Sequence, residues 1–290
     1  MIFIFFLYII NMIINMIINI IKNNNMYIYI LIIIFLLVIF CTFDNYLYYY
    51  DEYLNENFVA NGNLDINIIV SRYNEDLKWT LEKPFDQFKY IVYNKGNNEN
   101  FEKKNVKEII SIPNVGKCDE TYLHHIIDNY NNLADINVFL PGSLDLKYKK
   151  RIARKLLKEI IDTNNAVFIS LNEYDIKKLH YNFKLDKYKT KHGSNRTLNP
   201  ESELKKSEIR PYGLWFESKF GYLKINCIIY YGIFSVHKKD IIQHPKSYYE
   251  DLIKGLQTGS NLEEGHFFER SWCAIFSPLK ETYVIKYNKL

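Results

Sequence analysis

An apolar run near the amino terminus, residues 26–43, limits the folds open to this chain more than any other segment. It reads MYIYILIIIFLLVIFCTF, eighteen residues without a charged residue, a glycine or a proline. As a helix it would be about 27 Å long, close to the apolar thickness of a thin bilayer. A helix in a soluble core is rarely apolar around its whole circumference over such a length. We therefore expect residues 26–43 to form a transmembrane helix.

Residues 1–25 are also largely apolar, but Asn11, Asn15 and Asn19 recur every four residues along one stripe of a helix. Each amide needs a partner in hydrocarbon. Three interpretations stay open: a second span in a tight hairpin, a cleavable leader, or a region left untranslated when synthesis starts at Met26. A single functional span is favoured.

The flanks of residues 26–43 indicate the orientation of the span. Lys22 precedes it, whereas the charged residues that follow it, up to Glu56, are all acidic. The positive-inside rule counts Lys and Arg, so Lys22 favours a cytoplasmic amino terminus. We expect a single-pass, type II protein of the secretory route, with residues 44–64 as a Tyr-rich stalk. The sequon Asn195-Arg196-Thr197 agrees with that location.

Composition excludes several classes of protein for the rest of the chain. A 48% hydrophobic and 16% aromatic content excludes a disordered chain, and the formal charge of +4 is too mild to indicate a nucleic-acid partner. The mean hydropathy is −0.22, so the part beyond the apolar end is polar on average. Four cysteines show no CxxC pair and no zinc-ligand spacing, which argues against a disulfide framework and leaves one bridge open.

Residues 65–280 alternate strand and helix patterns and are expected to form one α/β domain with a mostly parallel sheet and flanking helices. Short β-branched or aromatic runs predict strands at 65–71, 88–93, 136–140 and 166–171, and 3.6-residue periodicity predicts helices at 119–133, 148–161, 247–256 and 263–276. The Lys-rich residues at about 175–210 show no clear periodicity and are expected to form an exposed insertion.

The first predicted strand ends in a polar turn, Arg72-Tyr73-Asn74-Glu75. Ligands of open α/β sheets bind outside the carboxyl ends of the strands. Arg72 offers a planar fork for phosphate, Tyr73 a stacking face, and Asn74 and Glu75 partners for sugar hydroxyls. The alternative is a strand-to-helix turn in which Asn74 caps the next helix.

Two further segments could line the same crevice. Asn94-Lys95-Gly96 ends the second strand, and Gly116 precedes the first long helix. Glycine permits close backbone approach, and a helix N-terminus favours anions. Neither segment is a P-loop or a GxGxxG motif.

Metal-ligating residues are sparse. His124 and His125 lie beside Asp128 on one helix, which supplies too few ligands and is better explained as an i,i+4 pair. Asp145 is the single acid close to the end of the third strand. One carboxylate together with phosphate oxygens can hold Mg²⁺ or Mn²⁺, so Asp145 is the candidate metal ligand.

The densest polar cluster is EEGHFFERSW, residues 263–272. On one continuous helix His266, Glu269 and Arg270 would fall within a turn, beside an apolar stripe. A carboxylate fixed by an arginine and an aromatic wall can act as a general base. The alternative is a buried Glu–Arg pair that anchors the helix.

Five segments together resemble a family of proteins that share a domain of unknown function: SRYNEDLKW, YIVYNKG, NVGKCDETYLHHIIDNYNNLADINVFLPGS, GIFSVHKKDIIQHPKSYYEDL and GHFFERSWCAIF. That family in turn resembles glycosyltransferases of the GT-A fold. The resemblance implies a nucleotide-sugar donor at Arg72, Tyr73, Asn74 and Glu75, with Glu269 as the base that deprotonates an acceptor hydroxyl. His266 would accompany Glu269.

One departure from the GT-A pattern affects the expected cofactor. Metal-dependent GT-A enzymes carry Asp-x-Asp after the strand that here ends VFLPGSLDL, with the single acid Asp145. The expected function is therefore a membrane-anchored glycosyltransferase that moves a sugar to a glycan or protein hydroxyl, with Mn²⁺ or Mg²⁺ dependence in question. The alternative is a catalytically degenerate GT-A-like module that binds glycan or protein.

Overall fold

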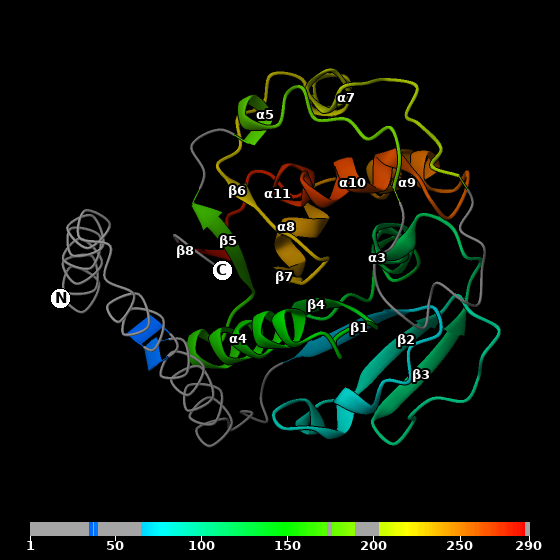
Figure 1. The fold of residues 1–290 in the computed structure, drawn as a ribbon, viewed down its shortest axis with the longest axis vertical. Helices are drawn as coiled ribbons and strands as arrows, with labels where there is room; N and C mark the ends of the chain where they lie inside the picture. Colours follow the sequence, from blue (N-terminus) through cyan, green and yellow to red (C-terminus); the bar gives the residue numbers. More distant parts are fainter. Residues whose placement is uncertain (1–34, 37, 40–64, 173–175, 189–202, 288–290) are drawn as a thin grey trace, which may run out of the picture. The chain divides into compact units, whose positions relative to one another are not determined.

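The computed structural model describes residues 35–36, 38–39, 65–172, 176–188 and 203–287 (Figure 1). The chain divides into two compact units, residues 1–57 and 58–290. In the first unit the four described residues are helical, and Phe35, Leu36 and Val38 are exposed. Within the described ranges no helix has the length and apolar character that crossing a bilayer requires. The predicted leader at 1–25, nearly all of the span at 26–43 and the stalk at 44–64 lie outside those ranges.

The second unit is an α/β fold around a five-stranded sheet of order β3-β2-β1-β4-β7. The strands are β1 (Ile66–Arg72), β2 (Tyr90–Asn94), β3 (Val106–Ser111), β4 (Ile136–Pro141) and β7 (Phe234–His237). The first four are parallel, with Ile69 opposite both Ile91 and Phe139, and β7 runs antiparallel beside β4. The predicted mostly parallel sheet with flanking helices is confirmed.

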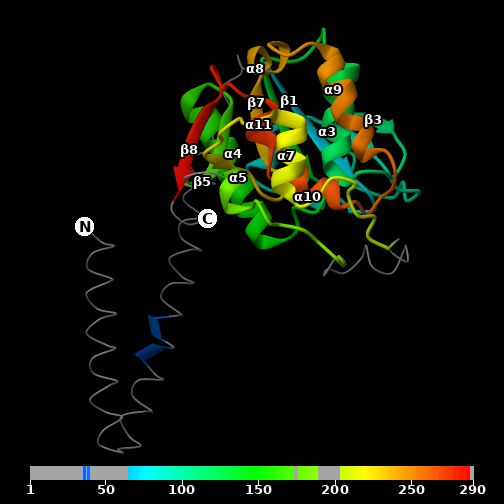
Figure 2. The same ribbon diagram turned by 90° about the horizontal axis from the view of Figure 1, so that it is seen from above.

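Both faces of this sheet are covered, because side chains along a strand alternate between faces. Ile69 of β1 packs into one apolar cluster with α3 (Lys117–Asp128), whereas Ile68 and Val70 pack into another with α4 (Lys147–Thr163). α3 and α4 therefore cover opposite faces. Figures 1 and 2 both place α3 beside α9 (Lys246–Ile253).

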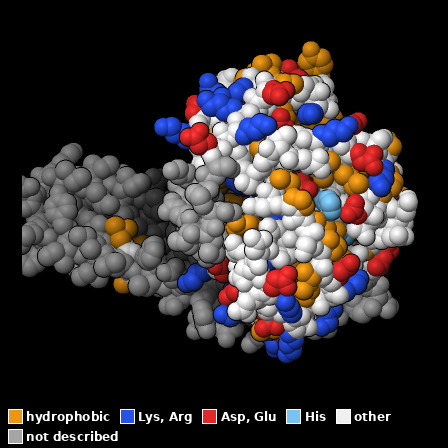
Figure 3. Space-filling view, turned by 90° about the vertical axis from the view of Figure 1, so that its right-hand side faces the viewer, with side chains coloured by type: hydrophobic (Ala, Val, Ile, Leu, Met, Phe, Trp, Pro, Cys, Tyr) orange, Lys and Arg blue, Asp and Glu red, His pale blue; other side chains and the backbone are white. Residues whose placement is uncertain are grey.

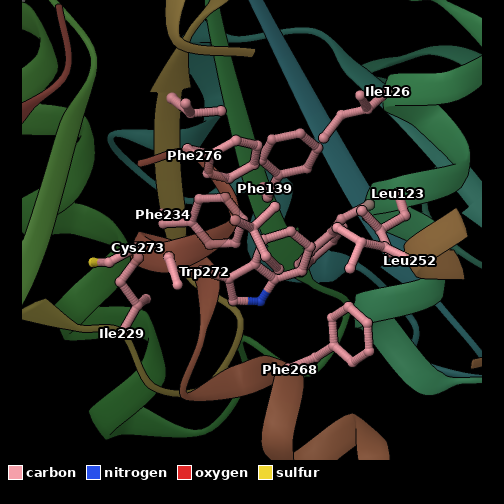
Figure 4. Close-up of a cluster of buried hydrophobic side chains, with 14 of the residues drawn as sticks. Leu123, Ile126, Phe139, Ile229, Phe234, Leu252, Phe268, Trp272, Cys273 and Phe276 are labelled. Atoms are coloured by element: carbon pink, nitrogen blue, oxygen red, sulfur yellow. The ribbon is translucent and has the colours of Figure 1, made fainter. Parts of the chain in front are cut away.

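The cluster on the α3 face is built largely from aromatic rings (Figure 4). Phe234 of β7 lies 5.0 Å from Phe139 of β4 and 4.9 Å from Trp272, measured between ring centroids, and Tyr122 of α3 lies 4.9 Å from Phe139. Aromatic pairs at such spacings stabilise a core beyond the area they bury. They join the sheet to the carboxyl-terminal helices.

A second sheet has the order β6-β5-β8, with β5 (Val167–Asn172) between β6 (Cys227–Ile228) and β8 (Tyr283–Tyr287). The strand predicted at 166–171 therefore exists, but it lies outside the main sheet, because β7 occupies the place beside β4. The Ser235 hydroxyl of β7 links the two sheets through both backbone groups of Val167, at 2.7 and 2.9 Å. β8 lies past residue 280, where we expected the domain to end.

The carboxyl-terminal half is helical. Its helices are α5 (Ile176–Leu179), α7 (Tyr212–Phe220), α8 (Lys238–Ile242), α9, α10 (Glu263–Glu269) and α11 (Trp272–Ile275), and the 3-10 turn η3 (Lys254–Leu256) follows α9. Two further 3-10 turns, η1 (Lys78–Leu81) and η2 (Phe85–Gln87), lie between β1 and β2. A disulfide between Cys227 and Cys273 joins β6 to α11, with 6.2 Å between the Cα atoms. It is the single bridge that the cysteine pattern left open.

The expectation of one helix over residues 263–276 is wrong, because α10 ends at Glu269 and α11 begins at Trp272. Ser271 lies at the break, and its hydroxyl donates to the Phe267 carbonyl at 2.9 Å. Such a bond to the preceding turn bends a helix. Glu269 and Arg270 are therefore at a helix end rather than in the middle of a continuous helix.

Parts of the insertion expected at 175–210 are described, and they are held by the buried Glu263. Its carboxylate accepts the backbone N–H groups of Leu185 and Ser207 at 2.8 and 2.9 Å and pairs with Arg210 at 3.0 Å. The sequon at Asn195 lies outside the described residues.

Candidate functional site

The carboxyl ends of the parallel strands bring most of the predicted site residues to one edge of the sheet. The chain passes from β1 outward to β2 and β3, and then returns to place β4 on the other side of β1. The connections thus change direction between β1 and β4. In open α/β sheets this is the place where ligands bind.

A cavity of about 630 Å³ opens at the ends of β1, β2 and β3. It is lined by one tyrosine, five polar or charged side chains and two apolar ones: Tyr73, Asn74, Lys95, Asn97, Asn98, Asn114, Ile112 and Pro113. Three of these, Tyr73, Asn74 and Lys95, are predicted site residues. The four asparagines supply donors and acceptors without net charge, which suits a polar, uncharged portion of a ligand.

The turn after β1 is fixed by Glu75. Its Oε2 atom accepts the backbone N–H groups of Tyr73 at 2.7 Å and Asn74 at 3.1 Å. A Cβ at Gly142, after β4, would lie 2.9 Å from the same oxygen. The following 3-10 turn η1 is preceded by Leu77 without a side-chain cap, so the alternative in which Asn74 caps a helix is wrong.

Arg72 lies beneath this turn with no exposed surface. Its Nε donates to the Glu75 carbonyl at 2.7 Å and its Nη1 to Asn94 Oδ1, and the guanidinium lies 3.9 Å over the Phe101 ring. Burial lowers the pKa of Arg72, and nearby acids, Glu75 first, oppose that shift. The arginine expected at the donor therefore joins the ends of β1 and β2.

Lys95 is similarly occupied. Its ammonium donates to the carbonyls of Val115 and Lys117 and forms a buried ion pair with Glu120 of α3 at 2.7 Å. Burial lowers the pKa of Lys95, and Glu120 opposes this shift. Lys95 lines the cavity with its stem, while its charge anchors the start of α3.

Two glycines let the backbone segments approach each other. A Cβ at Gly96 would lie 1.7 Å from the Tyr73 carbonyl oxygen, so no other residue fits there. Gly116, the N-cap of α3, has a φ of +56°, and a Cβ there would lie 2.6 Å from the Leu256 carbonyl. The predicted residues Gly96 and Gly116 therefore let neighbouring backbone segments pack closely, and neither they nor Asn94 line the cavity themselves.

A second group of polar side chains lies at the ends of β1 and β4. Lys149, in the first turn of α4, donates to Ser143 Oγ at 2.8 Å. Burial lowers the pKa of Lys149, and the charges of Cys118, Glu75, Glu269 and Asp145 raise it. These interactions place the predicted Asp145 and Glu269 in the electrostatic surroundings of one lysine.

This donor set does not fit the expected Mn²⁺ or Mg²⁺ site. Asp145 is exposed, the nearby Ser143 hydroxyl is bound to an ammonium group, and a cation already lies among the acids. Across the described residues no group of three His, Cys, Asp or Glu side chains could hold a metal ion.

Glu269 terminates α10 and is partly exposed, with 24% of its side chain accessible. Its Oε1 accepts the Tyr231 backbone N–H at 2.8 Å, and its Oε2 lies 3.6 Å from Arg270 Nη1. The pairing with Arg270 expected in the alternative interpretation is thus present, but neither side chain is buried as that interpretation expected, and the carboxylate keeps access to solvent.

Asp119, in the first turn of α3, was not expected at the site. Burial and then the charge of Glu269 raise its pKa to about 7, opposed by a hydrogen bond from Trp272 Nε1 at 3.0 Å. A carboxyl group that titrates near neutral pH is a frequent component of an active site. The sequence signal for it was weak: one acid after Gly116 in a chain rich in acids.

His266 lies on α10, with its ring 4.3 Å from the Tyr188 ring. Burial, then the charges of Lys117 and Arg270, lower its pKa to about 3, so the imidazole is neutral near pH 7. Its buried Nε2 atom has no hydrogen-bond partner among the described residues. The predicted catalytic pair is thus a carboxylate and a neutral imidazole.

The paired histidines of α3 do not belong to this site. His124 Nε2 lies 3.1 Å from Asp128, the i,i+4 pair that we expected, and His125 is buried with its Nδ1 3.0 Å from the Tyr93 hydroxyl. Burial lowers the pKa of His125 to about 3. Figure 3 shows one face of the molecule, on which positively and negatively charged side chains are interspersed.

Two comparisons with known proteins bear on this arrangement. A family model described as "Protein of unknown function (DUF3431)" matches residues 68–288, which is more than half of the chain and includes the cavity and both polar groups. No curated protein matches the chain.

Proposed function

Since the chain belongs to the DUF3431 family of proteins of unknown function, we propose its activity from the site: it transfers a sugar from a nucleotide-sugar to an acceptor hydroxyl. The observation that carries this proposal is the cavity at the ends of β1 to β3, flanked at the end of β4 by a lysine and acids. The cavity has room for a nucleoside, and in this proposal the lysine and acids act on the charge that develops during transfer.

In this proposal the nucleoside occupies the cavity. The Tyr73 ring offers a stacking face, and the amides of Asn74, Asn97 and Asn98 offer hydrogen bonds to a base or ribose. Arg72 and Lys95 act indirectly by fixing the two turns that carry these side chains.

Glu269 is the proposed general base. Its carboxylate takes the proton of the acceptor hydroxyl while that oxygen bonds to the anomeric carbon, and the bond from this carbon to the diphosphate oxygen breaks. The Tyr231 N–H holds one carboxylate oxygen, and the other, which lies 3.6 Å from Arg270 Nη1, takes the proton of the acceptor. Positioned general bases contribute about 10²- to 10⁴-fold in rate.

We place this activity in the secretory route, on a type II membrane anchor at residues 26–43 that positions the domain near glycan or protein acceptors. The Cys227–Cys273 disulfide supports an oxidising compartment, because cytosolic proteins rarely keep such bonds. Surface biotinylation and glycosidase treatment of the tagged full chain would test the orientation.

The direct test measures sugar transfer or slow donor hydrolysis by the full chain, purified in detergent, against a panel of nucleotide-sugars. We expect Glu269→Gln to lower the rate by about 10²-fold or more. The matched control is Glu250→Gln on α9, in an exposed pair with Lys246, which should leave the rate unchanged. A wild-type chain inert toward every nucleotide-sugar would end the proposal.

One observation favours the alternative of a non-catalytic binding module. The two cations predicted to bind the donor, Arg72 and Lys95, are both engaged by groups of the protein itself. Thermal shift separates the two functions: a transferase melts at a higher temperature with a nucleotide-sugar, whereas a pure glycan- or protein-binding module does not respond to nucleotide.

A further inference from the structure

The first turn of α4 carries an unusual charge pattern. It contains Lys147, Lys149 and Lys150 and no acidic residue. The N-terminus of a helix bears a partial positive charge, so each lysine there is unfavourable unless an anion compensates it. Local conflicts of this kind are expected at functional sites.

Lys150 has such a compensation, but Lys149 does not. Lys150 pairs with Glu82 at 2.7 Å on the surface. Lys149 points to the end of β4, where its ammonium donates to Ser143 Oγ, and no carboxylate of the described residues lies within ion-pair distance of it. An ammonium group has three donors, so Lys149 can bind a further acceptor.

The acids around Lys149 are largely compensated by other groups. Glu75 accepts two backbone N–H groups, Glu269 has the Tyr231 N–H and Arg270, and Asp119 titrates near pH 7 against Trp272. Asp145 is exposed and screened by water. Among the described residues at this place, the ammonium of Lys149 is therefore the charge that lacks a dedicated partner.

The position of Lys149 relative to the cavity is informative. Glu75, one of its electrostatic neighbours, directly holds the turn that presents Tyr73 and Asn74 to the cavity. Glu269 is another neighbour. The geometry agrees, because Ser143, which accepts the hydrogen bond from Lys149, follows Gly142, and a Cβ at Gly142 would lie 2.9 Å from Glu75 Oε2. In the proposed function the diphosphate of a bound nucleotide-sugar would lie here, between its nucleoside and its sugar.

We propose that Lys149, held by Ser143, binds the diphosphate of the donor and takes the place of a metal ion there. This inference rests on the proposed function and adds the class of ligand and the absence of a metal requirement. The ammonium donates hydrogen bonds to the diphosphate oxygens, whose negative charge grows as the bond to the anomeric carbon breaks. Lys149 keeps its proton throughout, and the leaving group departs as the nucleoside diphosphate.

The experiment measures binding of UDP, GDP, CDP and ADP to the detergent-purified full chain by calorimetry, once with EDTA and once with Mn²⁺. We expect at least one of them to bind equally well under both conditions. Lys149→Met should weaken that binding about ten- to a hundredfold, the usual effect of losing a hydrogen bond to a charged group. Lys149→Arg should retain part of it.

Lys150→Met is the matched control, because it removes a neighbouring ammonium of the same turn that is paired on the surface. It should bind as wild type does, and all variants should melt within a few degrees of it. Binding that requires Mn²⁺, or equal binding by Lys149→Met and wild type, overturns the role of Lys149 and leaves the proposed function standing. No binding of any nucleoside diphosphate by wild type overturns both.

Discussion

The two polar regions at the edge of the main sheet differ in how their charges are satisfied. In the strand-end platform, comprising Arg72, Asn94, Lys95 and Gly96, most charged donors have acceptors within the protein: Lys95 has three and Arg72 three, although the buried Nη2 of Arg72 has none among the described residues. The charge cluster, comprising Asp119, Lys149 and Glu269, has one lysine with a single internal acceptor among the described residues and one carboxyl group with a strongly shifted pKa.

This difference distinguishes residues that support the fold from residues that are available to bind a ligand or take part in a reaction. Buried charged groups with several internal partners hold backbone in place, and removing one partner leaves the other unpaired. Incompletely matched charges stabilise the fold less and remain available to a ligand. Substitutions in the platform should therefore change stability, and substitutions in the charge cluster should change binding and rate.

The largest expected effect is that of Lys95→Met. It leaves Glu120 buried without its cation, which should lower the free energy of unfolding by about 3–5 kcal/mol. Lys149→Met also removes one ammonium group but strands no paired carboxylate, and it should lower that free energy by less than about 1 kcal/mol. Urea unfolding of both variants measures the difference, and equal losses would remove the distinction between the two regions.

Asp119→Asn should stabilise the protein at alkaline pH. The unfolded chain ionises this carboxyl at its ordinary pKa of 3.8, whereas the folded chain holds the proton up to a pKa of about 7. The amount by which Asp119 lowers the free energy of unfolding therefore grows from about pH 4 to about pH 7 and is constant above that. The asparagine keeps an acceptor for Trp272 and should gain at most about 4 kcal/mol at pH 8.

The pH dependence is the decisive part of that measurement. Melting curves of wild type and Asp119→Asn should nearly coincide at pH 4 and diverge as the pH rises toward 8. A variant that is equally stabilised or destabilised at every pH would show that Asp119 has an ordinary pKa in the folded protein.

Gly96→Ala comes next. Its new Cβ would meet the Tyr73 backbone oxygen at 1.7 Å, so the two turns must separate, with a loss of about 1–3 kcal/mol. Gly259→Ala is the control, since a Cβ there makes an ordinary 3.5 Å contact with Leu262. We expect Gly96→Ala to lose nucleotide binding together with stability, because Gly96 lies between Lys95 and Asn97, which line the cavity. Loss of neither would show that the approach of the turns is loose.

The smallest expected effect concerns an exposed ion pair near the strand-end platform. Lys78 pairs with Asp76 at 3.2 Å in the segment after β1, and both side chains are more than half exposed. Lys78→Ala should change the free energy of unfolding by less than about 0.5 kcal/mol, because exposed pairs contribute little. A larger loss, measured in urea at low and high salt, would mean that surface charge and not buried pairing holds the platform.

The elements that sequence predicted well are those with a strong local signal. β1, β2, β4 and α4 lie within two residues of their expected bounds, because β-branched runs and helical periodicity are local properties. β3 was missed, since it is a largely exposed edge strand with Lys107 and Glu108 in it. The placement of β7 beside β4, which moves β5 to another sheet, depends on contacts between distant segments.

The candidate site was predictable to a similar degree. The turns after β1 and β2 were found because polar residues at strand ends are visible in the chain. The internal hydrogen bonds and ion pair of Arg72 and Lys95 could not be predicted, because their partners Asn94 and Glu120 come from other elements. Asp119 and Lys149 were missed for the same reason, since burial gives them their altered pKa values.

The bond between Cys227 and Cys273 also changes how the protein responds to proteolysis. The two cysteines are 46 positions apart, and the chain between them carries β7 and helices α8 to α10, including Glu269. A protease that cuts once inside this covalent ring opens it without releasing either fragment. The intact disulfide thus keeps the proposed base attached to the sheet after a single cleavage, until a reductant breaks that bond.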